Sequence, residues 1–145
     1  MNFDLAPERS SIIKVIGVGG GGGNAVNHMF QRGIKDVNFV VCNTDGQALA
    51  NSPVAVKLQL GENLTEGRGA GSNPVLGEES AKESMEEIKE AIAEPSMVFI
   101  TCGLGGGTGT GSAPIIAETA KSMGALTVAV VTLPFISEGK IRMEN

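Results

Sequence analysis

Tryptophan and tyrosine are absent from this chain of 145 residues, and phenylalanine occurs only five times. Proteins that bind single-stranded nucleic acids usually stack the bases on aromatic side chains, and nucleic-acid-binding proteins in general carry a basic face. The formal net charge of −5 at pH 7 does not favour such a face. We therefore expect no nucleic-acid polymer as a partner, although a single nucleotide remains compatible with the composition.

Cysteine, histidine and long apolar runs are also scarce. Cys42 and Cys102 each end an apolar run, without CxxC spacing or a Cys/His cluster, which favours reduced, buried thiols over a disulfide or a metal site. His28 has no nucleophile arranged beside it and is expected to be a packing or surface residue. No stretch approaches the roughly 18 apolar residues of a membrane span. Residues 1–11 lack the basic start and apolar core of a secretory signal. These absences predict a cytoplasmic protein without direct membrane insertion.

Five short runs rich in valine and isoleucine are predicted to be strands. They are continuous rather than alternating, which is typical of parallel strands covered on both faces. Helical patterns separate them, so the fold class is expected to be α/β, with a doubly wound, mostly parallel, Rossmann-like sheet of order 3-2-1-4-5. The predicted strands are residues 12–17, 37–42, 54–58, 97–102 and 126–133.

Three helices are predicted between these strands. The first carries an apolar stripe over residues 25–30 and ends near Gly33. A long helix over residues 77–93 buries four apolar side chains and ends at Pro95. The third ends at Gly124, and Pro114 is expected within its first turn.

Glycine is the abundant residue, and 12 of the 21 glycines fall in residues 17–23 and 103–111. Each run follows a predicted strand and precedes a predicted helix. Bare backbone before a helix N-terminus can approach phosphate oxygens closely, and the free N–H groups favour an anion. Strands 1 and 4 are neighbours in the expected order, so loops 19–24 and 103–109 should open onto one crevice and hold one phosphate chain. Hydroxyl groups of Thr108, Thr110 and Ser112 are expected as further donors.

The nature of the nucleotide is less well defined by these loops. No G-x-x-x-x-G-K-[ST] motif supplies a lysine, so a triphosphate would need a divalent cation, most simply Mg²⁺ held by phosphates and water. Asp45 has three possible roles, which are orienting a water of that ion, binding a dinucleotide ribose, or capping a helix. A third glycine-rich loop, residues 66–74, would have to fold inward to reach the terminal phosphate.

Five motifs follow one another along the chain: GVGGGGGNAVNHM, NTDGQAL, GRGAGSNP, GLGGGTGTGSAP and LPFISEGKIR. In this order they resemble the successive nucleotide loops of the FtsZ family, the tubulin-like cell-division GTPases of bacteria. Within the third motif, Arg68 and Ser72 stand where family members often carry a small or apolar residue. The resemblance implies a GTP- or GDP-binding site, with Glu138 on the ribose and Arg142 beside the nucleotide. The implied site comprises Gly20, Gly21, Gly22, Gly23, Asn24, Asn43, Asp45, Ala70, Gly71, Asn73, Gly103, Gly106, Gly107, Thr108, Gly109, Thr132, Pro134, Glu138 and Arg142.

The resemblance also implies a head-to-tail homopolymer in the division ring at midcell. In the family, the guanine contacts, a central helix, a second domain and the acidic loop that completes a neighbour's site lie beyond the equivalent of residue 145. We therefore expect a flexible segment 1–11, an incomplete GTP-binding domain 12–145 without catalytic residues of its own, and binding of other cell-division proteins elsewhere. Two alternatives are a dinucleotide-dependent oxidoreductase, which would use only the first glycine run, and a non-catalytic nucleotide-binding fragment.

Overall fold

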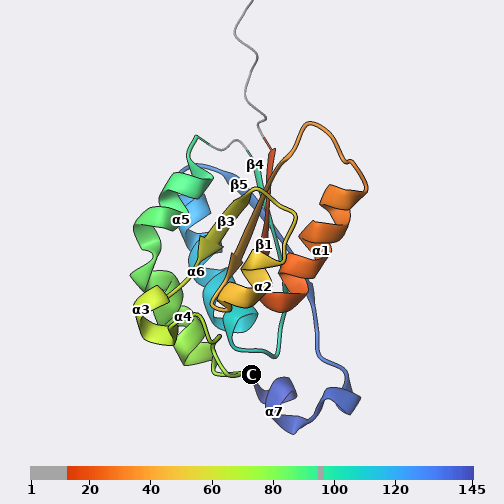
Figure 1. Ribbon diagram of the computed structural model, residues 1–145, viewed down its shortest axis with the longest axis vertical. Coiled ribbons are helices and arrows are strands. Elements are labelled where there is room, and N and C mark those ends of the chain that lie inside the picture. Colours follow the sequence, from red (N-terminus) through yellow and green to blue (C-terminus); the bar gives the residue numbers. More distant parts are fainter. Residues whose placement is uncertain (1–12, 95–96) are drawn as a thin grey trace, which may run out of the picture.

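The computed structural model describes residues 13–94 and 97–145, which form a sheet of five parallel strands with helices on both faces (Figure 1). The order β3-β2-β1-β4-β5 confirms the predicted order. The predictions for residues 1–11 and for Pro95 lie outside the described residues. The strands are β1 (Ile13–Val18), β2 (Asn38–Asn43), β3 (Val56–Gln59), β4 (Met97–Gly103) and β5 (Leu126–Thr132).

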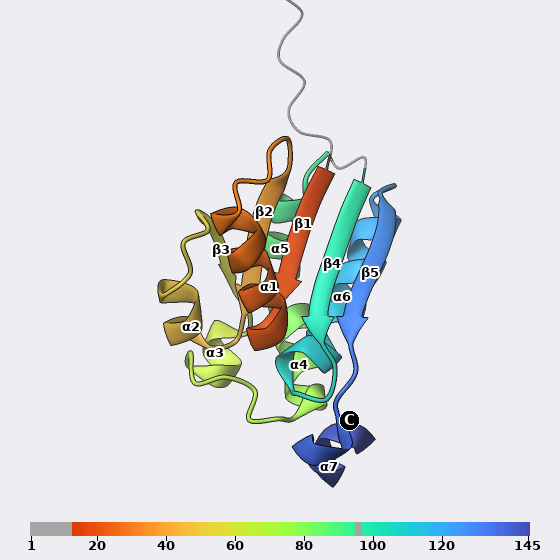
Figure 2. The ribbon, with the colours of Figure 1, turned by 90° about the vertical axis from the view of Figure 1, so that its right-hand side faces the viewer.

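Two layers of helices enclose this sheet, as Figure 2 shows. One face is covered by α1 (Gly19–Gln31) and α2 (Gly46–Ala50). The other is covered by α4 (Pro74–Glu83), α5 (Met85–Ile92) and α6 (Thr108–Ser122). Three short helices complete the described chain: α3 (Glu62–Thr65), the 3-10 helix η1 (Ile136–Glu138) and α7 (Lys140–Glu144). In the described part of the chain, no helix combines the length and apolar character needed to cross a bilayer.

The central strands are buried on both faces, as their continuous apolar sequence predicts. Val15 packs with Val26 of α1, whereas the next residue, Ile16, packs in a second cluster with Ile88 of α5 and Ile116 of α6. Each of these side chains is at least 95% buried, and full burial of such a side chain contributes about 1.5–3 kcal/mol. The sheet is therefore held by two separate apolar clusters, one under each helical layer.

Both cysteines lie in this core as free thiols. Burial raises the pKa of Cys42 to about 12 and also raises that of Cys102. His28 lies exposed on α1, as one of its two expected placements. These findings agree with the predicted roles of the three residues.

The edge strand β5 differs from the prediction of cover on both faces. Leu126 is 62% exposed and Val130 is 58% exposed. The reason is that β5 pairs only with β4, while α1 packs on β1, β2 and β4. The continuous apolar sequence of β5 is therefore not matched by described helices on both sides.

The prediction of one helix over residues 77–93 was wrong, because the segment divides at Ser84 into α4 and α5. Ser84 has ψ of 26°, outside the helical range. Its hydroxyl accepts a hydrogen bond from the Gly61 N–H at 3.0 Å and donates to the Gln59 carbonyl at 3.4 Å. These bonds tie the helix junction to the end of β3, a contact that no helical periodicity reveals.

Two helix starts also differ from the predictions. The segment 19–24, expected to be a loop, already forms the first turns of α1. Helix α6 begins at Thr108, so Pro114 lies inside it rather than in its first turn. In both cases glycines allow the helix to start close against its neighbours. A β-carbon on Gly22 would overlap the Thr101 carbonyl, and one on Gly111 would overlap that of Pro74.

Candidate functional site

A cavity of about 540 Å³ lies at the carboxyl ends of the strands. Segments that follow β1, β2, β4 and β5 all contribute to its wall, together with the third glycine-rich loop. Its lining residues are Val18–Gly21, Asn43–Asp45, Ala48, Arg68–Ser72, Gly103, Leu104, Gly106–Gly109, Thr132–Pro134, Glu138 and Arg142. The cavity is thus at the switch point of the sheet, where doubly wound folds bind ligands.

The two glycine runs lie side by side in this wall. A β-carbon added to Gly21 would lie 3.3 Å from the Gly103 nitrogen, and one added to Gly19 would lie 3.0 Å from the Gly109 nitrogen. By contrast, a β-carbon on Gly20 or Gly106 would meet no atom within 4 Å. Some glycines in each run therefore permit close backbone packing, whereas others leave backbone bare toward the open cavity.

The helices α1 and α6 present uncapped N-termini at the cavity. Neither has a side-chain hydrogen bond at its N-cap or an acidic residue in its first turn. Unpaired N–H groups and the positive end of the helix dipole attract anions, and phosphate is a frequent ligand of such ends. The neighbouring helices α2 and α4, in contrast, are capped by Asp45 and Asn73. The uncapped ends occur where a ligand could supply the missing acceptors.

The third loop folds inward, as it must to reach the cavity. The Gly69 N–H donates to the Thr44 carbonyl at 3.2 Å, and Ala70 is 5% exposed. A β-carbon on Gly107 would lie 2.8 Å from the Ala70 β-carbon and 2.8 Å from the Asn73 nitrogen. The loop therefore closes directly over the backbone at the start of α6.

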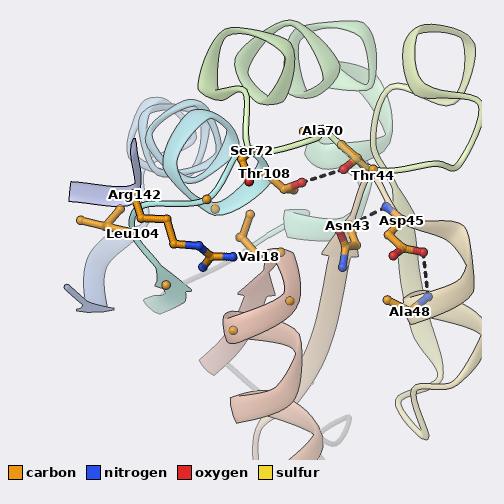
Figure 3. A pocket seen from close by; sticks show the side chains of 18 of the residues that line it. Val18, Asn43, Thr44, Asp45, Ala48, Ala70, Ser72, Leu104, Thr108 and Arg142 are labelled. Atoms are coloured by element: carbon orange, nitrogen blue, oxygen red, sulfur yellow. Dashed lines mark hydrogen bonds between the residues drawn. The ribbon is translucent and has the colours of Figure 1, made fainter. Parts of the chain in front are cut away.

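The hydroxyl groups expected to bind phosphate are mostly occupied within the protein. Thr110 Oγ1 accepts the Gly105 N–H at 2.9 Å, and Ser112 Oγ donates to the Gly77 carbonyl at 2.6 Å. Neither residue lines the cavity, so the structure does not place these two hydroxyl groups with the expected phosphate donors. Thr108 does line it, but its Oγ1 lies 2.6 Å from Thr44 Oγ1 in a buried hydrogen bond (Figure 3).

Asp45 acts as a helix cap, one of the three roles considered. Its Oδ1 accepts the N–H groups of Gln47 at 2.9 Å and Ala48 at 3.1 Å. Asn43 Oδ1 in turn accepts the Asp45 N–H at 3.2 Å. Both cap bonds use the same carboxylate oxygen, so Oδ2 is available to the cavity that Asp45 lines. Capping and ligand binding are therefore compatible at this residue.

The opposite side of the cavity carries an ion pair, and Figure 3 shows Arg142 across from Asp45. Arg142 Nη1 lies 3.8 Å from Glu138 Oε1, while Glu138 Oε2 accepts the Phe135 N–H at 2.6 Å. Asn145 Nδ2 donates to the carbonyls of Ser72 and Gly105, each at 3.0 Å. Asn145 thus connects the end of α7 to both the third loop and the second glycine run, a contact that sequence reasoning missed.

Four residues of the expected site lie outside this cavity. Gly22 packs against β4, and Gly23 and Asn24 line a smaller cavity of about 40 Å³ between α1 and α2. Asn73 caps α4, with Oδ1 accepting the N–H groups of Val75 and Leu76. The other fifteen expected residues all line the large cavity. Lining residues that the implied site did not name individually are Val18, Gly19, Thr44, Ala48, Arg68, Gly69, Ser72, Leu104 and Leu133, of which Gly19 and Leu104 belong to the two loops predicted to hold phosphate. Most of these directly adjoin an expected position, which was the available signal.

A parallel sheet of this order, with glycine-rich helix ends around a cavity at its switch point, defines the class of doubly wound α/β folds that bind phosphate-bearing ligands. Within that class, the model of the Tubulin/FtsZ family, GTPase domain, matches residues 12–145. The chain therefore belongs to the Tubulin/FtsZ family.

Individual relatives agree with this assignment. The chain is 58% identical to cell division protein FtsZ 1 of Methanocaldococcus jannaschii over 99% of its own length and 42% of that protein. A structure of an empty FtsZ dimer from M. jannaschii is similar over 92% of the present chain, which corresponds to 39% of the FtsZ chain, with a TM-score of 0.90 and 57% identity. A GTPγS-bound protofilament of CetZ2 from Haloferax volcanii is similar over 90% of the present chain, which corresponds to 42% of the CetZ2 chain, with a TM-score of 0.80 and 29% identity. The chain spans less than half the length of each of these relatives.

Proposed function

We propose that residues 12–145 form a GTP-binding unit of a polymer-forming cell-division GTPase. The observation that carries this proposal is the pair of uncapped helix N-termini, those of α1 and α6, beside one cavity at the switch point. Membership of the Tubulin/FtsZ family supports guanine as the base.

The backbone is proposed to bind the phosphate chain from two sides. N–H groups in the first turn of α1, at Gly20 and Gly21, and those at Gly107 to Gly109 belong to adjacent segments that line the same cavity, and they are proposed to bind the phosphate oxygens together. Ala70 and Gly71 of the third loop close the phosphate end, where Asn43 and Asp45 also lie. Glu138 and Arg142 are proposed to contact the ribose and the nucleotide at the other end. The donors of α1 and α6 are fixed by helix ends, and the third loop is held by the bond from the Gly69 N–H to the Thr44 carbonyl, so little backbone ordering is needed on binding.

The charges of the site indicate a need for a divalent cation. The charged lining residues carry two negative charges, on Asp45 and Glu138, and two positive charges, on Arg68 and Arg142. These charges cancel, so the described side chains do not neutralise a triphosphate. Among residues 13–94 and 97–145, no group of three or more His, Cys, Asp or Glu could hold a metal ion. We propose Mg²⁺ held mainly by phosphate and water oxygens, and Asp45 Oδ2 and Asn43, which line the same cavity, would bind its waters. When bound, the ion would neutralise phosphate charge.

Hydrolysis is proposed to require a second subunit. The carboxylates that line the cavity are both engaged, Asp45 as the α2 cap and Glu138 with the Phe135 N–H and Arg142. Asp45 keeps Oδ2 for the cavity, where it is proposed to bind a water of Mg²⁺, and Glu138 is paired at the other end, so a carboxylate from a neighbouring copy is proposed to activate the attacking water and complete the site. The dimeric FtsZ and protofilament CetZ2 relatives support head-to-tail assembly. A cytoplasmic location at the midcell division site, with other cell-division proteins bound elsewhere, is proposed on the same family grounds.

The test is GTP turnover by the purified full-length protein over a range of protein concentrations. The turnover per subunit should rise steeply above a threshold concentration, at which light scattering should also rise. Turnover per subunit that is independent of concentration would contradict a shared active site. Nucleotide released by denaturing the protein should be GDP or GTP, whereas release of NAD or FAD would support the oxidoreductase alternative.

A further inference from the structure

The two cations in the cavity wall differ in their surroundings. Arg142 pairs with Glu138, which also accepts a backbone N–H, in the segment after β5. Arg68 lies in the third loop, where its backbone forms an isolated antiparallel bridge with Asp45. Because Figure 3 places Asp45 and Arg142 on opposite sides of the cavity, Arg68 belongs to the Asp45 side. Among the described lining residues, it is the cation at that end.

The backbone around Arg68 is held in place on three sides. The Arg68 N–H donates to the Thr65 carbonyl at 2.9 Å. On either side of it, the Gly67 carbonyl accepts the Gly46 N–H at 3.0 Å, and the Gly69 N–H donates to the Thr44 carbonyl at 3.2 Å. The base of the side chain is therefore fixed to the segment that leaves β2, beside the cavity.

The guanidinium group, in contrast, is weakly held. The Arg68 side chain is 82% exposed, and its Nη2 lies 3.2 Å from Glu66 Oε2, whose side chain is 68% exposed. Water and salt screen such a surface pair, so it contributes little to stability. Glu66 would remain well hydrated if the pair separated. The Arg68 guanidinium can therefore leave Glu66 for another acceptor at little cost in free energy.

Phosphate is a stronger partner than Glu66 for this group. The planar guanidinium matches phosphate oxygens through two parallel N–H···O bonds, and these charge-assisted bonds exceed neutral ones. The uncapped ends of α1 and α6 attract phosphate, but their donors are shared along the whole chain of phosphates. A cation at one end would act on the terminal group alone.

We propose that Arg68 leaves Glu66 and binds the terminal phosphate, so that it favours a nucleoside triphosphate over a diphosphate. This inference rests on the proposed function, because it assumes that the cavity holds a nucleotide with its last phosphate on the Asp45 side. It assigns a specificity-determining role to a side chain that stands where family members often carry a small or apolar residue.

The experiment compares equilibrium binding of GTPγS and GDP to the full-length protein with Mg²⁺, below its assembly threshold. Arg68→Leu should weaken GTPγS binding about fivefold more than GDP binding, the effect of losing a solvent-exposed charge-assisted hydrogen bond. The preference should also become less sensitive to salt. Arg68→Lys should keep part of it, because the charge remains while the planar fork is lost. The matched control is Arg32→Leu, which removes one exposed arginine at the far end of α1 and should leave both affinities unchanged.

Glu66→Gln separates a role of the side chain from a role in loop packing. It removes the competing negative charge, so GTPγS affinity should rise while GDP affinity stays constant. The inference is overturned if Arg68→Leu weakens both nucleotides equally or neither, if Glu66→Gln weakens GTPγS as Arg68→Leu does, or if Arg68→Leu changes only the assembly threshold. Failure of the wild-type protein to bind either guanine nucleotide would instead refute the proposed function itself.

Discussion

Replacing Gly20 by alanine should raise stability and weaken nucleotide binding at the same time. Gly20 lies in the first turn of α1 with φ outside the left-handed region, and a β-carbon there meets no atom within 4 Å. Alanine is favoured over glycine in helices by up to about 1 kcal/mol, so the free energy of unfolding should rise by about 0.5 kcal/mol at this terminal position. With an unfolding entropy of about 0.3 kcal/mol/K for a domain of this size, Tm should rise by roughly 2 °C.

The same methyl group should obstruct the ligand, because it would occupy open space at a residue whose backbone lines the large cavity. If phosphate loses one charge-assisted hydrogen bond to the backbone, the cost is about 1.5–3 kcal/mol, which raises Kd for GTP about 10- to 100-fold. Scanning calorimetry without nucleotide measures the first effect, and titration calorimetry measures the second. Stability should rise and GTP affinity should fall, because a side chain at Gly20 favours the helix but obstructs the ligand.

Gly23 provides the matched control for this variant. It lies on the same helix and its β-carbon would also meet no atom within 4 Å, but it lines the smaller cavity. Gly23→Ala should therefore stabilise the protein by up to about 1 kcal/mol and change Kd for GTP by less than about twofold. The reasoning is refuted if Gly20→Ala binds GTP as tightly as the wild type, or if both variants weaken binding equally.

Two further predictions concern stability. Thr44→Val should lower the free energy of unfolding by about 1–3 kcal/mol, because the buried Thr108 hydroxyl loses its partner at 2.6 Å. In urea unfolding, the double variant with Thr108→Val should lose less free energy of unfolding than the sum of the losses in the two single variants. Cys42 should make stability fall as the pH rises from 9 toward 12, because burial raises its pKa from 9.0 to about 12 and the unfolded chain releases the proton first. Each pH unit in that window should cost about 1.4 kcal/mol, and Cys42→Ala should flatten the slope in urea titrations; an identical slope in the variant would contradict this assignment.

The order of the sheet could be predicted because strong local signals agreed with one another. Continuous apolar runs, separated by helical stripes and glycine stops, leave few topologies for a parallel sheet. The division of α4 from α5 could not be predicted, because it depends on bonds from Ser84 to Gly61 and Gln59 across the fold. The early start of α1 could not be predicted either, since glycine disfavours helix and only packing against β1 and β4 offsets that preference.

The candidate site could be predicted mainly where its wall is backbone. Gly20, Gly106 and Ala70 were found from their place after strands or in a known motif, and all line the cavity. Hydroxyl groups were assigned less well, because a side chain's partner depends on tertiary structure. Thr44 and Thr108 are 64 residues apart in sequence, and nothing local indicates that they share a hydrogen bond.

The glycine runs carry two requirements that the fold makes compatible. Gly22 and Gly111 have no room for a β-carbon, because a helix lies against a neighbouring backbone there. Gly20 and Gly106 have room, so the fold itself would accept a side chain at either position. The helix ends of α1 and α6 can pack this closely against neighbouring backbone only if the residues in contact, such as Gly22 and Gly111, have no side chain. The backbone N–H groups near Gly20 and Gly106 remain accessible to a ligand only if these residues have no side chain either. Each glycine run is therefore long because some of its residues permit close packing and others keep the backbone accessible to a ligand. Substitutions at the closely packed positions should lower stability, whereas substitutions at the open positions should lower ligand affinity.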